Sequence, residues 1–349
     1  MVDALRHVPA GNPSSPHSEG RAARAALDRA RDLAAHALGV SRAEVTFVSS
    51  GTEAVNLGLL GAAKRLKKRG VIATWGAEHQ SVLAVVRRLQ SEGHAVEIAG
   101  VDHAAHADPD SIPTNAVLVS IGLANNEVGT IQPVADVIER AHDLGALVHI
   151  DACAGPRWTA IPAGADLVSI SGYKLGAGHG GLLLVKDGVK LDPLLFGGPQ
   201  EWGRRGGRED VAGAVAVSTA LVICKRGRED RGEAAAAQSR ALRLALLEVG
   251  GMLTGSDRRL PNFATCTFAH RRGEDLVMAL DLAGVAASSG SACASGSLDP
   301  SHVLLAMGLS LEQAQGSLRL TTGYSTTEDE IFRACALIRS VFEPRQHHA

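Results

Sequence analysis

The sequence lacks several features that would mark particular classes of protein. Its 35 Lys and Arg residues nearly balance 37 Asp and Glu residues, for a formal net charge of −2, so no charge excess points to nucleic acid or an anionic membrane. No apolar run approaches the roughly eighteen residues of a membrane span, and the N-terminus lacks a signal-peptide core. We expect a cytoplasmic protein that binds a small molecule or a protein, without direct contact to nucleic acid or membrane.

The five cysteines are odd in number, widely spaced and without a CxxC pair. This spacing argues against a disulfide framework and against a structural zinc site. His103 and His106, with acidic residues around them, suggest a metal site, but no regular element there would fix ligand geometry and a solvated acidic loop explains them as well. We therefore predict no metal.

Helical and strand-like apolar spacing alternate along the first two thirds of the chain. This alternation predicts right-handed βαβ crossovers and a mostly parallel sheet covered by helices on both faces. Strands are expected at 44–49, 71–75, 96–98, 117–121, 147–151, 167–171 and 182–185. Helices are expected at 19–38, from 53 onward, at 80–90 and at 134–144.

The pattern changes after Asp210 to a long Ala-rich helical stretch, interrupted by the charged run 225–233. A chain of 349 residues is long enough for two domains. We place a large domain at 1–228 and a smaller α+β domain at 229–349. Thr327 and Glu330 predict a capping box for a last helix through Val341.

Polar residues stand where strands are predicted to end, which is where ligands bind in such sheets. Gly51 and Thr52 begin a helix that can hold a phosphate, although Ser and Thr are also ordinary N-caps. Asp151 ends an apolar strand, and Lys174 follows another beside a glycine-rich segment without a Walker A ending. A lysine for a Schiff base, a carboxylate for a ring nitrogen and a phosphate seat suit pyridoxal phosphate (PLP). His79 can stack on such a ring or serve only as a helix cap.

The segment 285–304, VAASSGSACASGSLDPSHVL, carries Cys293 among small polar residues. Glycine and serine at this density build neither a core nor a regular helix, which predicts a mobile surface loop. Free cysteines are usually buried, so a cysteine on such a loop favours thiolate chemistry. A linker with an incidental cysteine is the alternative.

These motifs resemble the cysteine desulfurases of the PLP-dependent aminotransferase class V family, in the group with an SSGSAC loop. The match runs from GNPSSPHSEGR (Gly11 to Arg21) through EVTFVSSGTEAVN, AEHQSV, LANNEVGTIQPV, HIDA, SISGYK, FGGPQE and GEDLVMALDLAGVAASSGSACASGSLDPSHVLLAMGL to SLRLTTGYSTTEDEI, which covers almost the whole chain. The resemblance implies the PLP-dependent transferase fold type I, with the smaller domain carrying the cysteine loop, and a homodimer. It also implies conversion of L-cysteine to L-alanine and transfer of sulfur, through a persulfide on Cys293, to an acceptor protein or small molecule.

The same resemblance assigns roles to individual residues. Lys174 would bind PLP covalently, Asp151 would face the ring nitrogen and His79 would stack on the ring. Cys293 would attack the substrate sulfur, and Arg319 would clamp the substrate carboxylate through its planar guanidinium. Further implied contacts are Asn126 at the cofactor's phenolic oxygen and the substrate, and Gly51, Thr52, Ser171 and Arg208 at the phosphate.

The chain departs from the family pattern in several places. The usual opening strand, YLDxxATTP, has no counterpart before Gly11, so we expect a truncated N-terminal segment. Ala154 replaces a glutamine that bonds the cofactor's oxygen, and Tyr173 replaces the histidine before the lysine. Arg208 replaces a threonine that reaches the partner's phosphate; its charge suits a phosphate, but it is bulkier.

Other functions remain open on the same scaffold. Selenocysteine lyases and cysteine sulfinate desulfinases share it, although the SSGSAC loop favours sulfur transfer. A non-catalytic, desulfurase-like interaction protein is an alternative of another class. The joint presence of Lys174, Asp151, Cys293 and Arg319 argues against that alternative.

Overall fold

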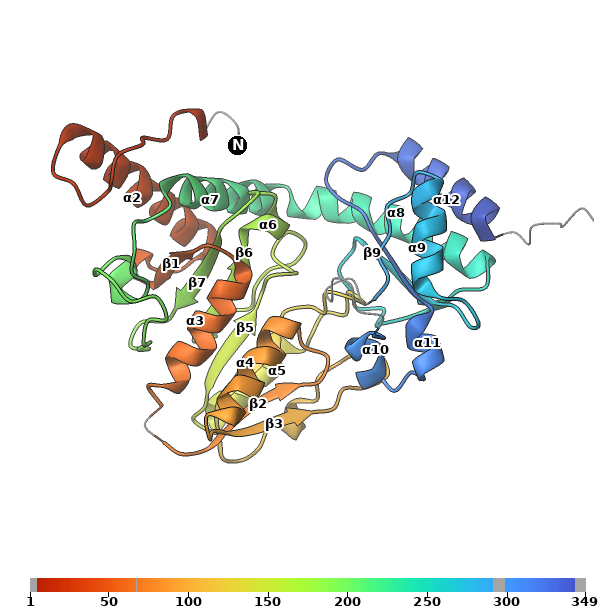
Figure 1. Ribbon diagram of the computed structural model, residues 1–349, viewed down its shortest axis with the longest axis horizontal. Coiled ribbons are helices and arrows are strands. Elements are labelled where there is room, and N and C mark those ends of the chain that lie inside the picture. Colours follow the sequence, from red (N-terminus) through yellow and green to blue (C-terminus); the bar gives the residue numbers. More distant parts are fainter. Residues whose placement is uncertain (1–4, 67, 291–298, 343–349) are drawn as a thin grey trace, which may run out of the picture. The chain divides into compact units, whose positions relative to one another are not determined.

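The computed structural model describes residues 5–66, 68–290 and 299–342, which fold into two compact units (Figure 1). Unit 1 comprises Met1–Ala99, Asp108–Leu123 and Gln132–Arg228, and unit 2 comprises Gly100–Ala107, Ala124–Ile131 and Glu229–Ala349. Unit 2 therefore takes two short segments from within the first 228 residues. Within the described residues, no helix is long and apolar enough to cross a membrane.

The sheet of unit 1 has seven strands in the order β1-β7-β6-β5-β4-β2-β3. Neighbouring strands from β3 to β6 pair in parallel, as predicted, whereas β7 is antiparallel to both of its neighbours. The short link between β6 and β7 explains this exception, because a parallel crossover needs roughly a dozen residues or more. The strands are β1 (Val45–Val48), β2 (Val71–Trp75), β3 (Ala95–Ala99), β4 (Ala116–Gly122), β5 (Leu147–Asp151), β6 (Leu167–Ser171) and β7 (Gly181–Val185).

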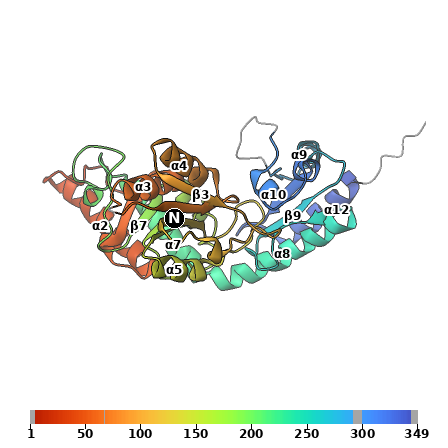
Figure 2. The ribbon, with the colours of Figure 1, turned by 90° about the horizontal axis from the view of Figure 1, so that it is seen from below.

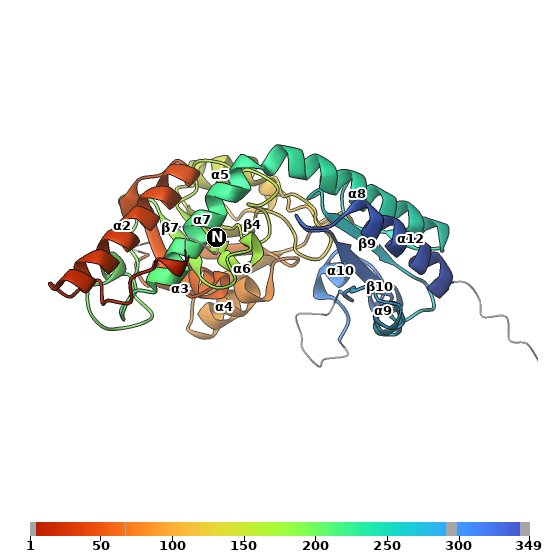
Figure 3. The same ribbon diagram turned by 90° about the horizontal axis from the view of Figure 1, so that it is seen from above.

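Helices cover both faces of this sheet (Figure 2). Helices α3 (Gly51–Ala63) and α4 (Gln80–Ser91) lie on one face, and α5 (Val134–Asp143) and α7 (Val211–Arg226) lie on the other. Helix α2 (Ser18–Leu38) packs along α7 (Figure 3). The amphipathic spacing of α4 shows why these helices pack here: its buried residues Val82, Leu83, Val85, Val86 and Leu89 form one apolar stripe.

Unit 2 is built on an antiparallel sheet in the order β10-β9-β8. Its strands are β8 (Met252–Leu253), β9 (Phe263–Thr267) and β10 (Ser317–Thr321). Helices α8 (Arg228–Glu248), α9 (Gly273–Leu282) and α12 (Glu328–Phe342) share one apolar core with this sheet, to which β10 contributes Leu318 and Leu320. Two shorter helices are α10 (His302–Ala306) and α11 (Leu311–Gln315).

The last helix confirms a prediction made from two residues. The backbone N–H of Thr327 donates to Glu330 Oε2 at 2.7 Å, and the Glu330 N–H donates to Thr327 Oγ1 at 3.2 Å. These reciprocal bonds are the predicted capping box. The charged run 225–233 interrupts the Ala-rich stretch only at Gly227, between α7 and α8.

Candidate active site

The carboxyl ends of β5 and β6 bring Asp151, Ser171 and Lys174 into one region of unit 1. Asp151 is the last residue of β5 and is only 6% exposed, and its Oδ1 accepts a hydrogen bond from the Cys153 N–H at 3.0 Å. Ser171 ends β6, and Lys174 lies in the one-turn helix α6 (Gly172–Leu175) that follows directly. The Lys174 side chain is exposed, so its amine is accessible beside a buried carboxylate.

The start of α3 lies directly against this region. A Cβ atom added at Gly51 would come within 2.5 Å of Cys153 Sγ and 3.0 Å of Ser171 Cβ, so no larger residue fits without rearrangement. The N-cap is Ser50, whose side chain accepts from the Glu53 N–H, while Thr52 is exposed. The backbone N–H groups at a helix start of this kind can bind a phosphate, and Gly51 leaves room for one. We call the start of α3 at Gly51 the phosphate seat.

A second carboxyl group lies close to Asp151. Glu78 is buried, and its Oε1 accepts from the backbone N–H of Gly122, the residue paired with Asp151 in the sheet, at 2.9 Å. Burial, together with the negative charge of Asp151, raises the pKa of Glu78 to about 8 against the effect of the Gly122 bond. The carboxyl group of Glu78 is therefore held in its protonated, neutral form at neutral pH, beside Asp151.

His79 follows Glu78 and begins α4. It is the N-cap of that helix: its Nδ1 accepts from the Ser81 N–H at 3.1 Å and lies 2.7 Å from Ser81 Oγ. The capping role considered from sequence is thus present, on the residue that would also stack on a bound ring. The cap fixes the orientation of the imidazole.

His149 lies beneath Asp151 on the same face of β5, two residues earlier. Its ring bridges neighbouring strands, with Nδ1 at 2.9 Å from Ser120 Oγ and Nε2 at 2.8 Å from Ser169 Oγ. Burial lowers the pKa of His149 to about 4, opposed by the charge of Asp151. Sequence reasoning missed this neutral histidine, although the alternation of His149 and Asp151 along a predicted strand was a usable signal.

Cys153 is a further residue that the sequence analysis did not assign to the site. Its Sγ lies 3.9 Å from the Ser169 carbonyl oxygen, and a Cβ atom added at Gly51 would lie 2.5 Å from it. Burial raises the pKa of this thiol well above its ordinary value; Asp151 adds to the shift and Lys174 opposes it. The cluster therefore contains a neutral thiol between Asp151 and the phosphate seat.

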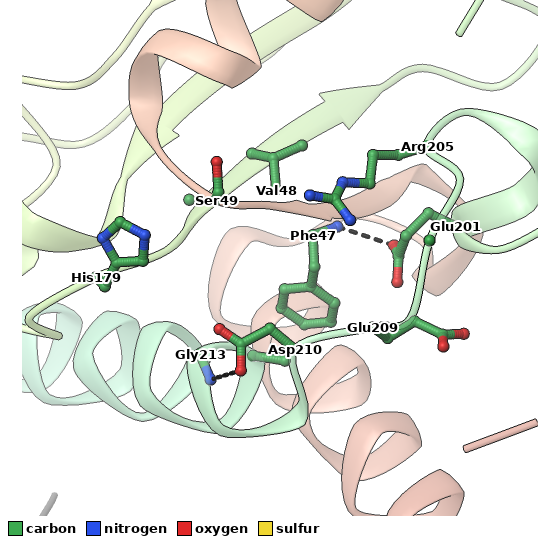
Figure 4. A pocket seen from close by; sticks show the side chains of 12 residues that line it. Phe47, Val48, Ser49, His179, Glu201, Arg205, Glu209, Asp210 and Gly213 are labelled. Atoms are coloured by element: carbon green, nitrogen blue, oxygen red, sulfur yellow. Dashed lines mark hydrogen bonds between the residues drawn. The ribbon is translucent and has the colours of Figure 1, made fainter. Parts of the chain in front are cut away.

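A cavity of about 110 Å³ lies in unit 1 beside the end of β1 and the start of β7 (Figure 4). On its wall, Glu201 accepts from the Phe47 N–H at 2.8 Å and forms a buried ion pair with Arg31 at 2.6 Å. Asp210 accepts from the Gly213 N–H at 2.9 Å and caps α7. The lining residues are Phe47, Val48, Ser49, His179, Gly181, Glu201, Arg205, Gly207, Glu209, Asp210, Gly213 and Ala214.

Arg205 connects this cavity to the first turn of α3. Its Nε donates to Glu53 Oε1 at 3.0 Å, and Glu53 also accepts from the N–H of Ser49 at 2.8 Å and from the Ser49 hydroxyl. Burial alone would raise the pKa of Glu53, but the bonds from Ser49 and Arg205 outweigh it and lower that pKa. Arg208 is exposed and donates from Nη2 to the Ala10 carbonyl at 3.2 Å.

Arg319 and Asn126 meet in unit 2. Arg319 is partly buried on β10, and its Nη1 donates to the backbone carbonyl of Asn126 at 2.8 Å. The backbone of Arg319 forms an isolated antiparallel bridge with Ser288, through bonds of 2.7 and 3.0 Å. Cys293 lies outside the described residues.

The residues of unit 1 fit a phosphate-bearing pyridine aldehyde. Asp151 provides a buried carboxylate, Lys174 an accessible amine, and Gly51 a helix start that only a residue without a side chain allows. Two departures from the family pattern border this cluster: Ala154 follows Cys153, and Tyr173 is 73% exposed beside Lys174.

Comparisons with known proteins agree with this chemistry. The model of the family "aminotransferase class-V" matches residues 1–333. The cysteine desulfurase IscS 1 of Archaeoglobus fulgidus is 37% identical over 344 residues, covering 95% of this chain and 90% of that protein. A cysteine desulfurase of a Nostoc species is 37% identical over 351 residues, covering 95% of this chain and 86% of that protein.

Solved structures give the same answer. A NifS-like protein superimposes with a TM-score of 0.90 at 30% identity, covering 97% of this chain and 94% of the other. A structure described as SspA in complex with cysteine gives a TM-score of 0.81 at 29% identity, covering 93% and 95%. The predicted α/β fold class and the family resemblance are confirmed. The chain belongs to the aminotransferase class V family.

Proposed function

We propose that this protein is a PLP-dependent cysteine desulfurase that converts L-cysteine to L-alanine and holds the sulfur as a persulfide on Cys293. The observation that carries the proposal is the grouping of Asp151 and Lys174 with the start of α3, at strand ends of a chain 37% identical to curated cysteine desulfurases.

In unit 1, the proposed roles follow from the positions of the side chains. When bound, PLP would supply an electron sink for the substrate. Lys174 would hold the cofactor covalently, and Asp151 would keep the ring nitrogen protonated. Glu78 is neutral and adds no second negative charge beside Asp151. The ring of His79 is oriented by its role as helix cap. The remaining contacts, at the phosphate, would come from Gly51, Thr52 and Ser171.

In unit 2, Arg319 would bind the substrate carboxylate, with Asn126 beside it. One guanidinium N–H is directed to the Asn126 carbonyl, and a guanidinium carries five N–H donors in all. The Cys293 thiolate would attack the sulfur of L-cysteine, so that the sulfur–carbon bond breaks. The electron pair of that bond would go to the alanine carbon, which takes up a proton, and the sulfur would stay on Cys293.

Purified protein tests the proposal directly. It should be yellow, and L-cysteine should yield L-alanine and sulfide in equal amounts when a reductant is present. Cys293→Ala should keep the colour and lose sulfide release. A protein that stays colourless with added PLP, or a coloured protein that forms no alanine, would contradict the proposal. Assays with L-selenocysteine and cysteine sulfinate would reveal the related activities.

The sulfur acceptor, the homodimer and the cytoplasmic location stay predictions. In a homodimer, Arg208 is proposed to reach the phosphate bound by the partner subunit. Arg208→Thr restores the family's usual residue and should change PLP affinity if that contact exists. Light scattering of the same samples would report the oligomeric state.

A further inference from the structure

Glu127 is a buried acidic residue next to Asn126, and the proposed reaction assigns it no role. It lies in the hairpin 124–131 of unit 2 and is 6% exposed. The hairpin is closed by the Asn125 N–H, which donates to the Thr130 carbonyl at 2.8 Å, and Asn125 Oδ1 accepts from the Glu127 N–H at 2.8 Å. The backbone of Glu127 therefore has a defined position within unit 2.

The Glu127 carboxyl group binds Ser301, the N-cap residue of α10. The Ser301 hydroxyl donates to Glu127 Oε2 and also accepts from the Leu304 N–H at 3.2 Å, as the N-cap of the helix. Ser301 is 2% exposed, so water does not compete for this contact. Glu127 thereby holds the start of α10, the first helix among the described residues that follow Cys293.

The chain that leads toward Cys293 reaches the same carboxylate. The Gly290 N–H donates to Ser317 Oγ on β10 at 2.8 Å. A Cβ atom added at Gly290 would lie 3.2 Å from Glu127 Oε2 and 2.9 Å from Ser301 Cβ. Gly290 and Ser301, which precede and follow Cys293 in the sequence, thus both pack against Glu127.

Arg319 belongs to the same framework. It stands two residues after Ser317 on β10, bridges to Ser288 and donates to the carbonyl of Asn126. Burial raises the pKa of Glu127 above its ordinary value, although the Ser301 bond and the charges of His302 and Arg319 oppose that shift. The Glu127 carboxyl group therefore accepts a hydrogen bond from Ser301, which follows Cys293, lies close to Gly290, which precedes it, and interacts electrostatically with Arg319.

We propose that Glu127 is a positioning residue: through its bond to Ser301 and its packing against Gly290, it keeps the residues that precede and follow Cys293 at a fixed place relative to Arg319. This inference rests on the proposed desulfurase function, in which Cys293 must meet the sulfur of a substrate held through its carboxylate. Misplacing a reacting group by about 1 Å can lower a rate on the order of 100-fold. Loss of the Glu127–Ser301 contact should therefore slow sulfur transfer and leave cofactor binding unchanged.

Ser301→Ala tests the contact against a matched control, Ser310→Ala. Ser310 caps α11, which has five residues like α10, through a bond from the Gln313 N–H at 3.2 Å. Both variants lose an N-cap, but only Ser301→Ala loses the bond to Glu127. We expect Ser301→Ala to lower kcat for sulfide release about tenfold or more with KM within about twofold, and Ser310→Ala to match the wild type.

Two variants of Glu127 separate geometry from charge. Glu127→Gln can still accept the Ser301 bond and should retain most of kcat, whereas Glu127→Ala should lose as much as Ser301→Ala. If the charge near Arg319 were the important factor, Glu127→Gln would instead raise KM and Ser301→Ala would not slow turnover. That outcome would overturn the proposal.

A second measurement does not depend on turnover. The alkylation rate of Cys293, followed by peptide mass mapping, should differ about threefold or more between the wild type and Ser301→Ala, and should not differ in Ser310→Ala. If both serine variants match the wild type in kcat and alkylation, the inference fails. A wild type without desulfurase activity would refute the proposed function, while the alkylation comparison would still decide the role of Glu127. Melting temperatures identify a variant that fails to fold. In that case, kcat and alkylation of Glu127→Gln and Ser310→Ala decide the proposal.

Discussion

Unit 1 and unit 2 place their chemical groups in different ways. In unit 1, Asp151 and Ser171 are the last residues of neighbouring strands of a regular sheet. In unit 2, Arg319 and Asn126 stand 193 residues apart in the sequence and are joined by one side-chain bond between β10 and a hairpin. Strand order positions the first pair, and individual tertiary contacts position the second. The residues proposed to hold the cofactor belong to unit 1, and those proposed to bind the substrate carboxylate and take up its sulfur belong to unit 2.

The two units also treat buried charge differently. Around Asp151, the carboxyl of Glu78, the imidazole of His149 and the thiol of Cys153 are all kept neutral by burial. In unit 2, burial also raises the pKa of the Glu127 carboxyl, but a hydroxyl donor and the charges of His302 and Arg319 oppose that shift. These neutral neighbours add no charge of their own beside Asp151. A nearby carboxylate favours the protonated form of a ring nitrogen.

The largest expected effect is that of Lys174→Ala, which removes the proposed covalent link to the cofactor. The variant should lose the yellow colour of the lysine-bound cofactor and all L-alanine formation, because the amine proposed to form the Schiff base is removed. Its melting temperature should stay that of the wild-type apoprotein, since the side chain is exposed. Absorbance spectra and an alanine assay measure both effects.

Lys190→Ala is the matched control, because Lys190 is also exposed and follows β7. It should keep the colour and the activity. A Lys174→Ala protein that remains yellow would show that the cofactor is attached to another residue. The position of Lys174 after a strand of unit 1 would then not identify the cofactor-binding residue.

Arg319→Gln should have the next largest effect, and on binding rather than colour. Loss of charge-assisted hydrogen bonds to a carboxylate, worth about 1.5–3 kcal/mol, predicts a KM for L-cysteine raised about 10- to 100-fold. The PLP spectrum should be unchanged, because the residues proposed to hold PLP covalently and at its phosphate belong to unit 1. Steady-state kinetics measure the change, with Arg333→Gln on the exposed side of α12 as control. A colourless Arg319→Gln protein would contradict the division of roles between the units.

Much of unit 1 was predictable because its determinants are local. Apolar periodicity located every strand of its sheet to within a few residues, and Asp151 and Lys174 followed from their places after apolar runs. The direction of β7 was not predicted, since it depends on how little chain links it to β6. The membership of hairpin 124–131 in unit 2 was also missed, because it depends on contacts with segments distant in sequence.

The buried polar partners were the least predictable part. Glu78, His149 and Glu127 look like ordinary polar residues in the sequence, and only the folded chain shows which of them lack water and which groups face them. Burial and tertiary hydrogen bonds set their ionisation, and neither is encoded in local spacing. The roles predicted for Cys293 and for the phosphate contacts stay predictions.

Glu78→Gln should produce a moderate, pH-dependent change in stability. Burial raises the pKa of Glu78 from 4.5 to about 8, so the folded protein keeps a proton that the unfolded chain releases between these values. Its stabilising contribution is full below about pH 4.5 and is lost as the pH rises through about 8. The free energy of unfolding of the wild type, relative to Glu78→Gln, should fall by a few kcal/mol over this span.

Urea unfolding at several pH values measures this difference, and Glu97→Gln on the exposed face of β3 is the control. The control should show no pH-dependent difference from the wild type. A wild type that gained stability over Glu78→Gln as the pH rose would show that Glu78 is ionised in the folded protein. Unit 1 would then hold two neighbouring carboxylate charges, and the contrast with unit 2 would disappear.

The smallest effect is expected at Cys153, where a reagent rather than a substitution gives the sharper test. Because burial and Asp151 raise the pKa of this thiol well above its ordinary value, little thiolate exists near neutral pH. Its alkylation should be at least about tenfold slower than that of an exposed thiol, and slower still with PLP bound, since Sγ contacts the Gly51 end of α3. Rapid modification of Cys153, read from its peptide mass, would mean that the thiol is ionised or accessible. The neutral surroundings that distinguish unit 1 would then not exist at the position closest to the proposed phosphate seat.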